Sequence, residues 1–300
     1  MTPDRKPLDA NAFGLMTLLC MLWGFQQVTI KVAAPDVSLV MQAGIRSIIA
    51  TALLLVWARA RDIALFDRDG TGASGIAAGL LFAFEFVFIY GGLAHTTASR
   101  MIVFVYTAPC LTALMLPWFV RGERLGVRQW IGVLAAFGGI VAAFAEGFTS
   151  AKGETLAGDL AGLIAAFLWA ATTVLIRATR LGHAPATKTL FYQLAVSALV
   201  LPAVSVALGE PGVVRLTSLA AAILAYQGAI VAFASYLAWF WLLRKYMAAR
   251  LSVLSFLTPL FGVLFGALFL GERVTPVFLA AAVAVAGGIA LVNLPERAKR

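Results

Sequence analysis

Long apolar stretches alternate with short polar segments along the whole chain. Each stretch holds about 20 mostly apolar residues, the length that an α-helix needs to cross the hydrocarbon core of a bilayer. The polar segments leave no room for a folded domain. The pattern predicts an all-α integral membrane protein with ten transmembrane helices, at residues 12–34, 37–58, 74–94, 97–120, 129–147, 158–178, 187–208, 218–243, 248–270 and 275–293.

The second half of the chain repeats the first at an offset of 146 to 150 residues. Five spans in each half is an odd number, so the second copy enters the membrane inverted relative to the first. We expect the two repeats at residues 12–147 and 158–293. The corresponding segments are Leu22-Trp23 with Leu168-Trp169, Ala98-Ser99-Arg100 with Ala248-Ala249-Arg250, Pro109 with Pro259, and Gly122-Glu123-Arg124 with Gly271-Glu272-Arg273.

These duplicated motifs, together with a Trp-x7-Lys/Arg pattern at the head of each half, resemble the ten-helix EamA-type exporters of the drug/metabolite transporter superfamily. The resemblance covers nearly the whole chain. It implies a central cavity surrounded by the first four helices of each half, with the fifth and tenth helices supporting them from outside. It also implies a secondary transporter that exports amino acids or similar small amphipathic metabolites by alternating access. A multidrug exporter of the same fold and a passive metabolite channel stay open as alternatives.

Composition and charge agree with a membrane location. Hydrophobic residues make up 62% of the 300 residues and charged residues 12%, against roughly a quarter charged in soluble domains. If the N-terminus is cytoplasmic, 17 of the 23 Lys and Arg residues fall in cytoplasmic segments, as the positive-inside rule requires. We therefore expect a multi-pass protein of the bacterial inner membrane with both termini in the cytoplasm. The net charge of +9 reflects this asymmetry and indicates no nucleic-acid partner.

Enzyme and cofactor motifs are absent or out of context. The Gly70–Gly75 segment matches G-x-G-x-x-G, but it joins two apolar spans and does not follow a strand. No ATP-binding G-x-x-x-x-G-K occurs, so the chain does not take its energy from ATP. Cys20, Cys110 and the two histidines have no metal-ligand spacing. We predict a transporter with no enzymatic activity, cofactor or metal, whose partners are a small-molecule substrate and the lipid bilayer, as a monomer or homodimer.

Two charged residues fall near the middle of predicted spans. Arg46 lies in the second span and Glu85 in the third, where a charge is costly unless it is buried and partnered. A buried Arg46–Glu85 ion pair of purely structural value and a role in transport both stay open. Glu85 is also a candidate proton acceptor. The family resemblance supports an Arg in the second span, whereas a Glu in the third is less usual there.

Aromatic residues sort by depth. Trp57, Trp118, Trp130, Trp239 and Trp241 fall near cytoplasmic span ends, where interfacial aromatic belts form. Trp23 and Trp169 lie at mid-depth at equivalent repeat positions, which favours cavity lining over core packing. Tyrosine and glutamine side chains in other spans, including Tyr236, add hydroxyl and amide groups at varied depths. The candidate substrate-binding set is Trp23, Gln26, Glu85, Tyr90, Tyr106, Trp169, Gln193, Tyr226 and Gln227.

Repeat-related prolines interrupt the fourth and ninth spans. Pro109 and Pro259 lie about twelve residues into their spans, where a proline removes a backbone donor and kinks a helix. A matched hinge in each half and a fixed packing kink are both open, and alternating access favours the hinge. Small residues in the fifth and tenth spans predict close contact between those two helices, and they are also a candidate dimer surface.

Overall fold

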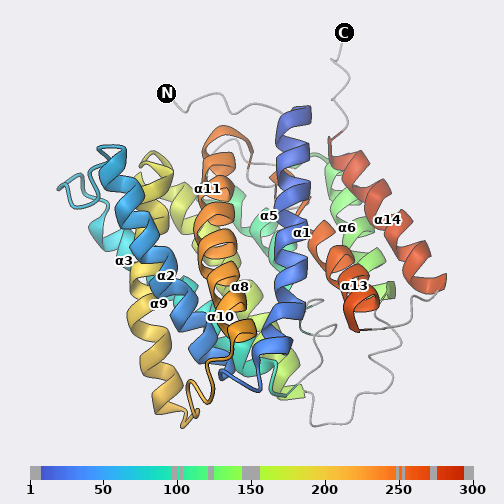
Figure 1. Cartoon of the computed structure of the whole chain (residues 1–300). Helices are drawn as coiled ribbons and strands as arrows, with labels where there is room; N and C mark the ends of the chain where they lie inside the picture. The colour runs from blue at the N-terminus through green and yellow to red at the C-terminus, as the bar shows by residue number, and fades with distance from the viewer. Residues whose placement is uncertain are drawn as a thin grey trace.

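A computed structural model describes residues 8–95, 101, 104–120, 125–143, 156–247, 250–251, 254–270 and 276–293. These residues are helical almost throughout (Figure 1). The Gly-Glu-Arg triplets and Ala98-Ser99-Arg100 lie outside the described residues. The helices are α1 (Ala10–Ala33), α2 (Leu39–Ala60), α3 (Gly72–Gly92), α5 (Ala108–Phe119), α6 (Val127–Ala143), α8 (Leu156–Ala178), η2 (Arg180–Gly182), α9 (Ala186–Ala207), α10 (Ser218–Ala225), the π-helix η3 (Tyr226–Ser235), α11 (Tyr236–Lys245), α13 (Leu257–Leu270) and α14 (Pro276–Asn293).

Six helical segments among the described residues are long and apolar enough to cross a membrane. They are α1, α2, α3, α8, α9 and the continuous run from α10 through η3 to α11. The other four predicted spans contain the shorter helices α5, α6, α13 and α14, of 12 to 18 residues. Parts of those four spans fall outside the described residues, so ten crossings stay a prediction.

The two halves run in opposite directions. Asp9 caps α1 by accepting a hydrogen bond from the Ala12 amide at 2.8 Å, and it also accepts one from the Tyr246 hydroxyl at 2.7 Å. Arg177, near the end of α8, donates to the Tyr246 carbonyl at 2.7 Å. Helix α1 therefore begins where α8 and α11 end, and α14 ends at this same N-terminal face of the bundle (Figure 1). Since α8 is the repeat counterpart of α1, these two counterparts run in opposite directions; the inverted insertion of the whole second repeat stays a prediction.

Helix packing follows the repeat. Helix α1 packs on α13 and α8 packs on α5, which are equivalent contacts, while α2 and α9 pack on each other. Helices α6 and α14 form a separate pair at the side of the bundle (Figure 1). A methyl group added to Gly288 of α14 would lie 2.6 Å from the Gly132 carbonyl of α6, so only glycine permits this approach. Helices α6 and α14 are the fifth and tenth predicted spans, and their place at the side of the bundle agrees with the expectation that these spans lie outside the helices around the cavity.

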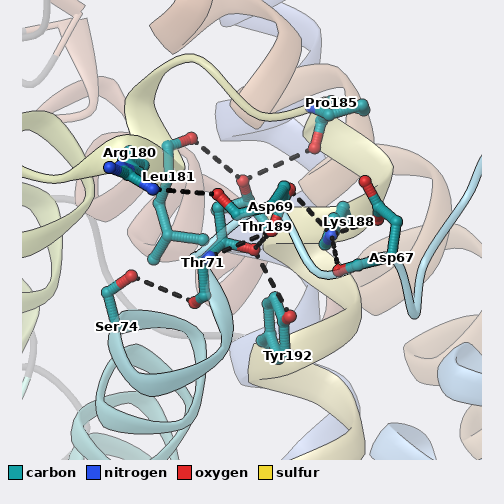
Figure 2. Close-up of polar contacts among 10 residues, drawn as sticks. All are labelled: Asp67, Asp69, Thr71, Ser74, Arg180, Leu181, Pro185, Lys188, Thr189 and Tyr192. Carbon is teal, nitrogen blue, oxygen red and sulfur yellow. Dashed lines mark hydrogen bonds and ion pairs between the residues drawn. The ribbon is translucent and has the colours of Figure 1, made fainter.

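A polar cluster joins the halves at the N-terminal face. The ammonium group of Lys188, in the first turn of α9, pairs with Asp67 and with Asp69 at 2.8 Å. Both carboxylates belong to the connection between α2 and α3 (Figure 2). The Arg180 guanidinium donates to the Asp69 carbonyl at 3.4 Å. Donors on Lys188 and Thr71 hold the pKa of Asp69 well below its usual range. We call this cluster the Lys188 latch.

An equivalent cluster joins the halves at the opposite face. The Glu210 carboxylate, between α9 and α10, accepts hydrogen bonds from the Val40 and Met41 amides at 3.1 and 3.2 Å. It therefore caps the N-terminus of α2, where a negative charge is favourable. Nearby, Arg215 pairs with Asp36 at 2.8 Å, and donors on Thr217 and Arg215 lower the pKa of Asp36. We call this cluster the Glu210 latch.

The two latches are repeat-related and hold the same helix pair. Each ties the connection after the second helix of one half to the start of the second helix in the other half. One fixes α2 to α9 at the N-terminal face, and the other fixes them at the opposite face. Polar contacts therefore fasten the α2–α9 pair at both faces.

Replacing Lys188 with Met removes the ammonium group and leaves both Asp carboxylates without it, so the protein should melt a few degrees lower in detergent. Because the pKa of Asp69 is lowered in the folded state, this contribution is fully present above the ordinary pKa of Asp, about 4, and disappears as the pH falls through the folded-state value. Melting curves at neutral and acid pH test both points. Lys31→Met, on an exposed side chain, is the matched control, and equal melting of the two variants at neutral pH would contradict the latch.

Candidate functional site

A cavity of about 130 Å³ lies among the helices of both halves. Nine of its twenty lining residues are aromatic, and Glu85 is the one charged residue among those that line it in the described part of the chain. The lining residues are Trp23, Gln26, Gln27, Ile30, Phe82, Glu85, Phe86, Ile89, Tyr90, Val105, Tyr106, Trp169, Thr172, Thr173, Ile176, Gln193, Tyr236, Trp239, Phe240 and Leu243.

Trp23 anchors one wall of the cavity. Its indole N–H donates to the Ser235 hydroxyl at 2.8 Å, at the last residue of η3. Its ring meets Trp239 and Tyr236 edge to face, with centroids 5.8 and 6.2 Å apart. Edge-to-face packing is a favourable geometry for aromatic pairs. The hydrogen bond satisfies the indole inside the protein and leaves the ring face as part of the wall.

Trp169, the repeat counterpart of Trp23, anchors the other wall. Its ring meets Tyr106 nearly perpendicularly, at 88° with a centroid separation of 5.5 Å. Tyr106 lies in a two-residue turn between the helical residues 104–105 and the start of α5. The aromatic frame of the cavity is therefore built twice, once around each repeat-related tryptophan.

Polar groups on the lining differ in how they are satisfied. The Gln26 amide donates to the Tyr90 hydroxyl at 3.1 Å, and the hydroxyls of Thr172 and Thr173 donate to carbonyls one turn earlier in α8. Gln193 is fully buried, and neither its amide nitrogen nor its oxygen has a hydrogen-bond partner among the described residues. Such a group costs free energy unless a ligand or water bonds it.

Arg46 lies behind the cavity wall. Its side chain is 1% exposed, and its guanidinium carbon stands 4.0 Å from the centroid of the Phe86 ring, with Tyr90 and Tyr236 farther away at 5.5 and 5.9 Å. Aromatic faces attract a cation, most strongly where water is excluded. The guanidinium is thus stabilised by π-systems whose other atoms form the cavity.

The amino-acid sequence matches the EamA-like transporter family twice, at residues 11–145 and 156–294. The chain belongs to this family. It is 27% identical over 286 residues to an Escherichia coli protein named "Probable amino-acid metabolite efflux pump", covering 92% of each chain. It is also 27% identical over 277 residues to an uncharacterized transporter of Archaeoglobus fulgidus, covering 89% of this chain and 91% of the relative.

A solved crystal structure has the same fold, with a TM-score of 0.78 over 95% of this chain and 98% of the other, at 22% identity. The family and its named relatives make this chain a multi-pass membrane transporter and not an enzyme. The EamA resemblance read from the duplicated motifs is therefore confirmed.

Most of the candidate binding residues of this EamA-like transporter converge on the cavity. Tyr226 and Gln227 do not line it. The Tyr226 hydroxyl donates to the Leu22 carbonyl at 2.9 Å, and the Gln227 amide donates to the Gln42 side chain at 3.2 Å. Both therefore tie η3 to neighbouring helices. The predicted residues that do line the cavity are Trp23, Gln26, Glu85, Tyr90, Tyr106, Trp169 and Gln193.

The predicted ion pair between Arg46 and Glu85 is not among the ion pairs of the described residues, although the two charges are close enough to interact electrostatically. The aromatic sheath around Arg46 takes the place of a direct carboxylate contact. Whether the two residues act in transport stays a prediction.

The interfacial assignment of Trp239 is wrong. Trp239 is 7% exposed and lines the cavity against Trp23. It lies six residues before the end of α11, roughly 9 Å along the helix axis, which is deep enough to reach the cavity. The preceding ten-residue π-helix has a different period from an α-helix, so α-helical spacing does not predict which way the following residues face. Trp118 and Trp241, in contrast, are exposed.

Pro109 and Pro259 lie at helix starts and not inside kinked helices. Pro109 is the second residue of α5 and Pro259 the third residue of α13. A two-residue turn precedes each helix, at residues 106–107 and 255–256. A proline is well tolerated in the first turn, where its missing N–H has no partner to lose. The repeat thus places a break, and not a bend, at the same point in each half.

Proposed function

We propose that this protein is a secondary transporter that exports amino acids or similar small amphipathic metabolites across the bacterial inner membrane by alternating access. The observation that carries the proposal is the aromatic cavity between the two halves, lined by residues of both. In inverted-repeat transporters the substrate site lies near the bilayer midplane at the repeat interface. The cavity's aromatic surface with a few polar groups suits an amphipathic solute better than an inorganic ion.

The latches restrict how such a cycle can proceed. Because α2 and α9 are fastened at both faces, we expect them to stay together while the helices around them change their contacts. The repeat-related breaks before α5 and α13 supply the flexible points, since backbone that has already left the helix can change its dihedral angles without breaking a helical hydrogen bond.

Counterflow in liposomes tests the function. Purified protein is reconstituted, the liposomes are loaded with unlabelled phenylalanine or leucine, and uptake of the radiolabelled amino acid is followed. We expect saturable uptake that accelerates with internal substrate, above protein-free liposomes. Flux without saturation or acceleration would instead identify a channel. Counterflow of organic drugs, with no counterflow of amino acids, would identify a multidrug exporter.

Replacing Pro109 or Pro259 with Ala should slow transport roughly tenfold, because an added amide donor extends α5 or α13 back across the break and a bias of about 1.4 kcal/mol changes a two-state ratio tenfold. Substrate binding should persist. Initial rates in liposomes, compared with equilibrium binding, separate the two effects. Pro117→Ala, in α5 but away from the break, is the matched control. Wild-type rates in both test variants would leave the breaks a packing role alone.

Single cysteines should report the orientation, in a background lacking Cys20 and Cys110. Asp62, in the connection between α2 and α3, and Val214, between α9 and α10, are exposed and lie outside helices. With cytoplasmic termini, Asp62→Cys should react with an impermeant thiol reagent only after the cells are opened, and Val214→Cys in intact cells. The reverse pattern would place the termini outside.

A further inference from the structure

Glu85 is a buried carboxylate without a hydrogen-bond or ion-pair partner among the described residues. It lies in α3, is 6% exposed, and lines the cavity. No hydrogen bond or ion pair joins its carboxylate to another residue in the described part of the chain. Its oxygens are nevertheless not among the fully buried side-chain atoms that lack a partner, which means that they reach cavity space. An ionised group in such a place is costly unless something in the cavity completes its interactions.

The nearest cation does not complete them. Arg46 is withdrawn behind Phe86, with its guanidinium over the ring face and its Nε and Nη1 atoms without hydrogen-bond partners. Direct pairing would bring guanidinium and carboxylate into bidentate contact. Arg46 instead offsets the charge of Glu85 from a distance and leaves both carboxylate oxygens open to the cavity.

Aromatic rings surround the space that this carboxylate faces. Phe82 and Phe86 come from the same helix, at ring centroids 4.8 Å apart, and Tyr236 packs on Phe82 at 5.9 Å from the other half. The two repeat-related tryptophans close the walls. A carboxylate within an aromatic enclosure is complementary to an organic ammonium group, which donates a charge-assisted hydrogen bond to the carboxylate and is attracted to the ring faces by cation–π interactions.

We infer that Glu85 binds the ammonium group of the transported substrate, with the aromatic walls holding the substrate's apolar part. This inference rests on the proposed function and narrows the substrate class to solutes with a protonated amine. Amino acids belong to that class. As zwitterions they add no net charge to the cavity, whose lining includes Glu85 and the polar side chain of Gln193.

Two matched ligands test the charge that the site selects. Phenethylamine and 3-phenylpropionate share a phenyl ring and a two-carbon chain but carry opposite charges. Equilibrium binding of tritiated phenethylamine to the purified full-length protein should be displaced by phenylalanine and not by 3-phenylpropionate. This comparison uses the wild-type protein, so it does not depend on the folding of any variant. Equal displacement by 3-phenylpropionate would overturn the inference.

Glu85→Gln keeps the size of the side chain and removes its charge. It should weaken phenethylamine binding about 10- to 100-fold, the usual range for losing a charge-assisted hydrogen bond. The variant should melt near the wild-type temperature, because no hydrogen bond or direct ion pair of the described residues is lost. Asp62→Asn removes one exposed carboxylate at φ 50°, a conformation that Asn also adopts, and should bind as wild type.

The outcomes separate this inference from the proposed function. Unchanged phenethylamine affinity in Glu85→Gln, or a lower melting temperature with unchanged affinity, would make Glu85 a structural residue and overturn the inference. Counterflow of amino acids, combined with equal binding of phenethylamine and 3-phenylpropionate, would also overturn the inference. It would leave the proposed transport function intact. Amine binding without any counterflow would uphold the ammonium site and contradict the transporter proposal.

Discussion

The hydrocarbon of a bilayer offers no hydrogen bonds, and the organisation of this protein depends on that constraint. Backbone groups are satisfied within helices, so the described chain contains almost nothing else. Side chains obey the same rule: the Trp23 indole bonds Ser235, and Gln227 bonds Gln42, which in turn donates to the Val37 carbonyl. The few buried polar groups that lack partners among the described residues are therefore informative, because each has lost its hydration without gaining a hydrogen bond in the folded protein.

Inversion gives the fold two faces with matching contacts. The repeat relates the α2–α3 connection at one face to the α9–α10 connection at the other. The Lys188 latch at the N-terminal face therefore implies an equivalent contact at the opposite face, which Glu210 and Asp36 provide. The chemistry differs between the two faces, with a lysine between two aspartates on one and a carboxylate capping a helix on the other. Each latch therefore preserves the geometry of the repeat without repeating its residues.

The sequence predicts what depends on composition and on duplication. Apolar length gives the helical class, and the repeat gives the inversion and the central position of Trp23 and Trp169. It does not predict what depends on local departures from the α-helix. Trp239 follows the π-helix η3 and lines the cavity, whereas Tyr226 and Gln227, at the start of η3, contact neighbouring helices. The breaks before Pro109 and Pro259 depend on how the flanking residues pack, and a proline by itself permits a bend as well as a break.

The separation of Arg46 from Glu85 shows how packing decides the chemistry of a site. A direct ion pair would satisfy both charges and leave the cavity without a free anionic group. Stacking the guanidinium on Phe86 changes this balance, because the ring stabilises the cation while the same residue contributes to the apolar lining of the cavity. The Glu85 carboxylate is then free to accept hydrogen bonds from a ligand, and the free energy of those bonds contributes to the binding of whatever enters the cavity.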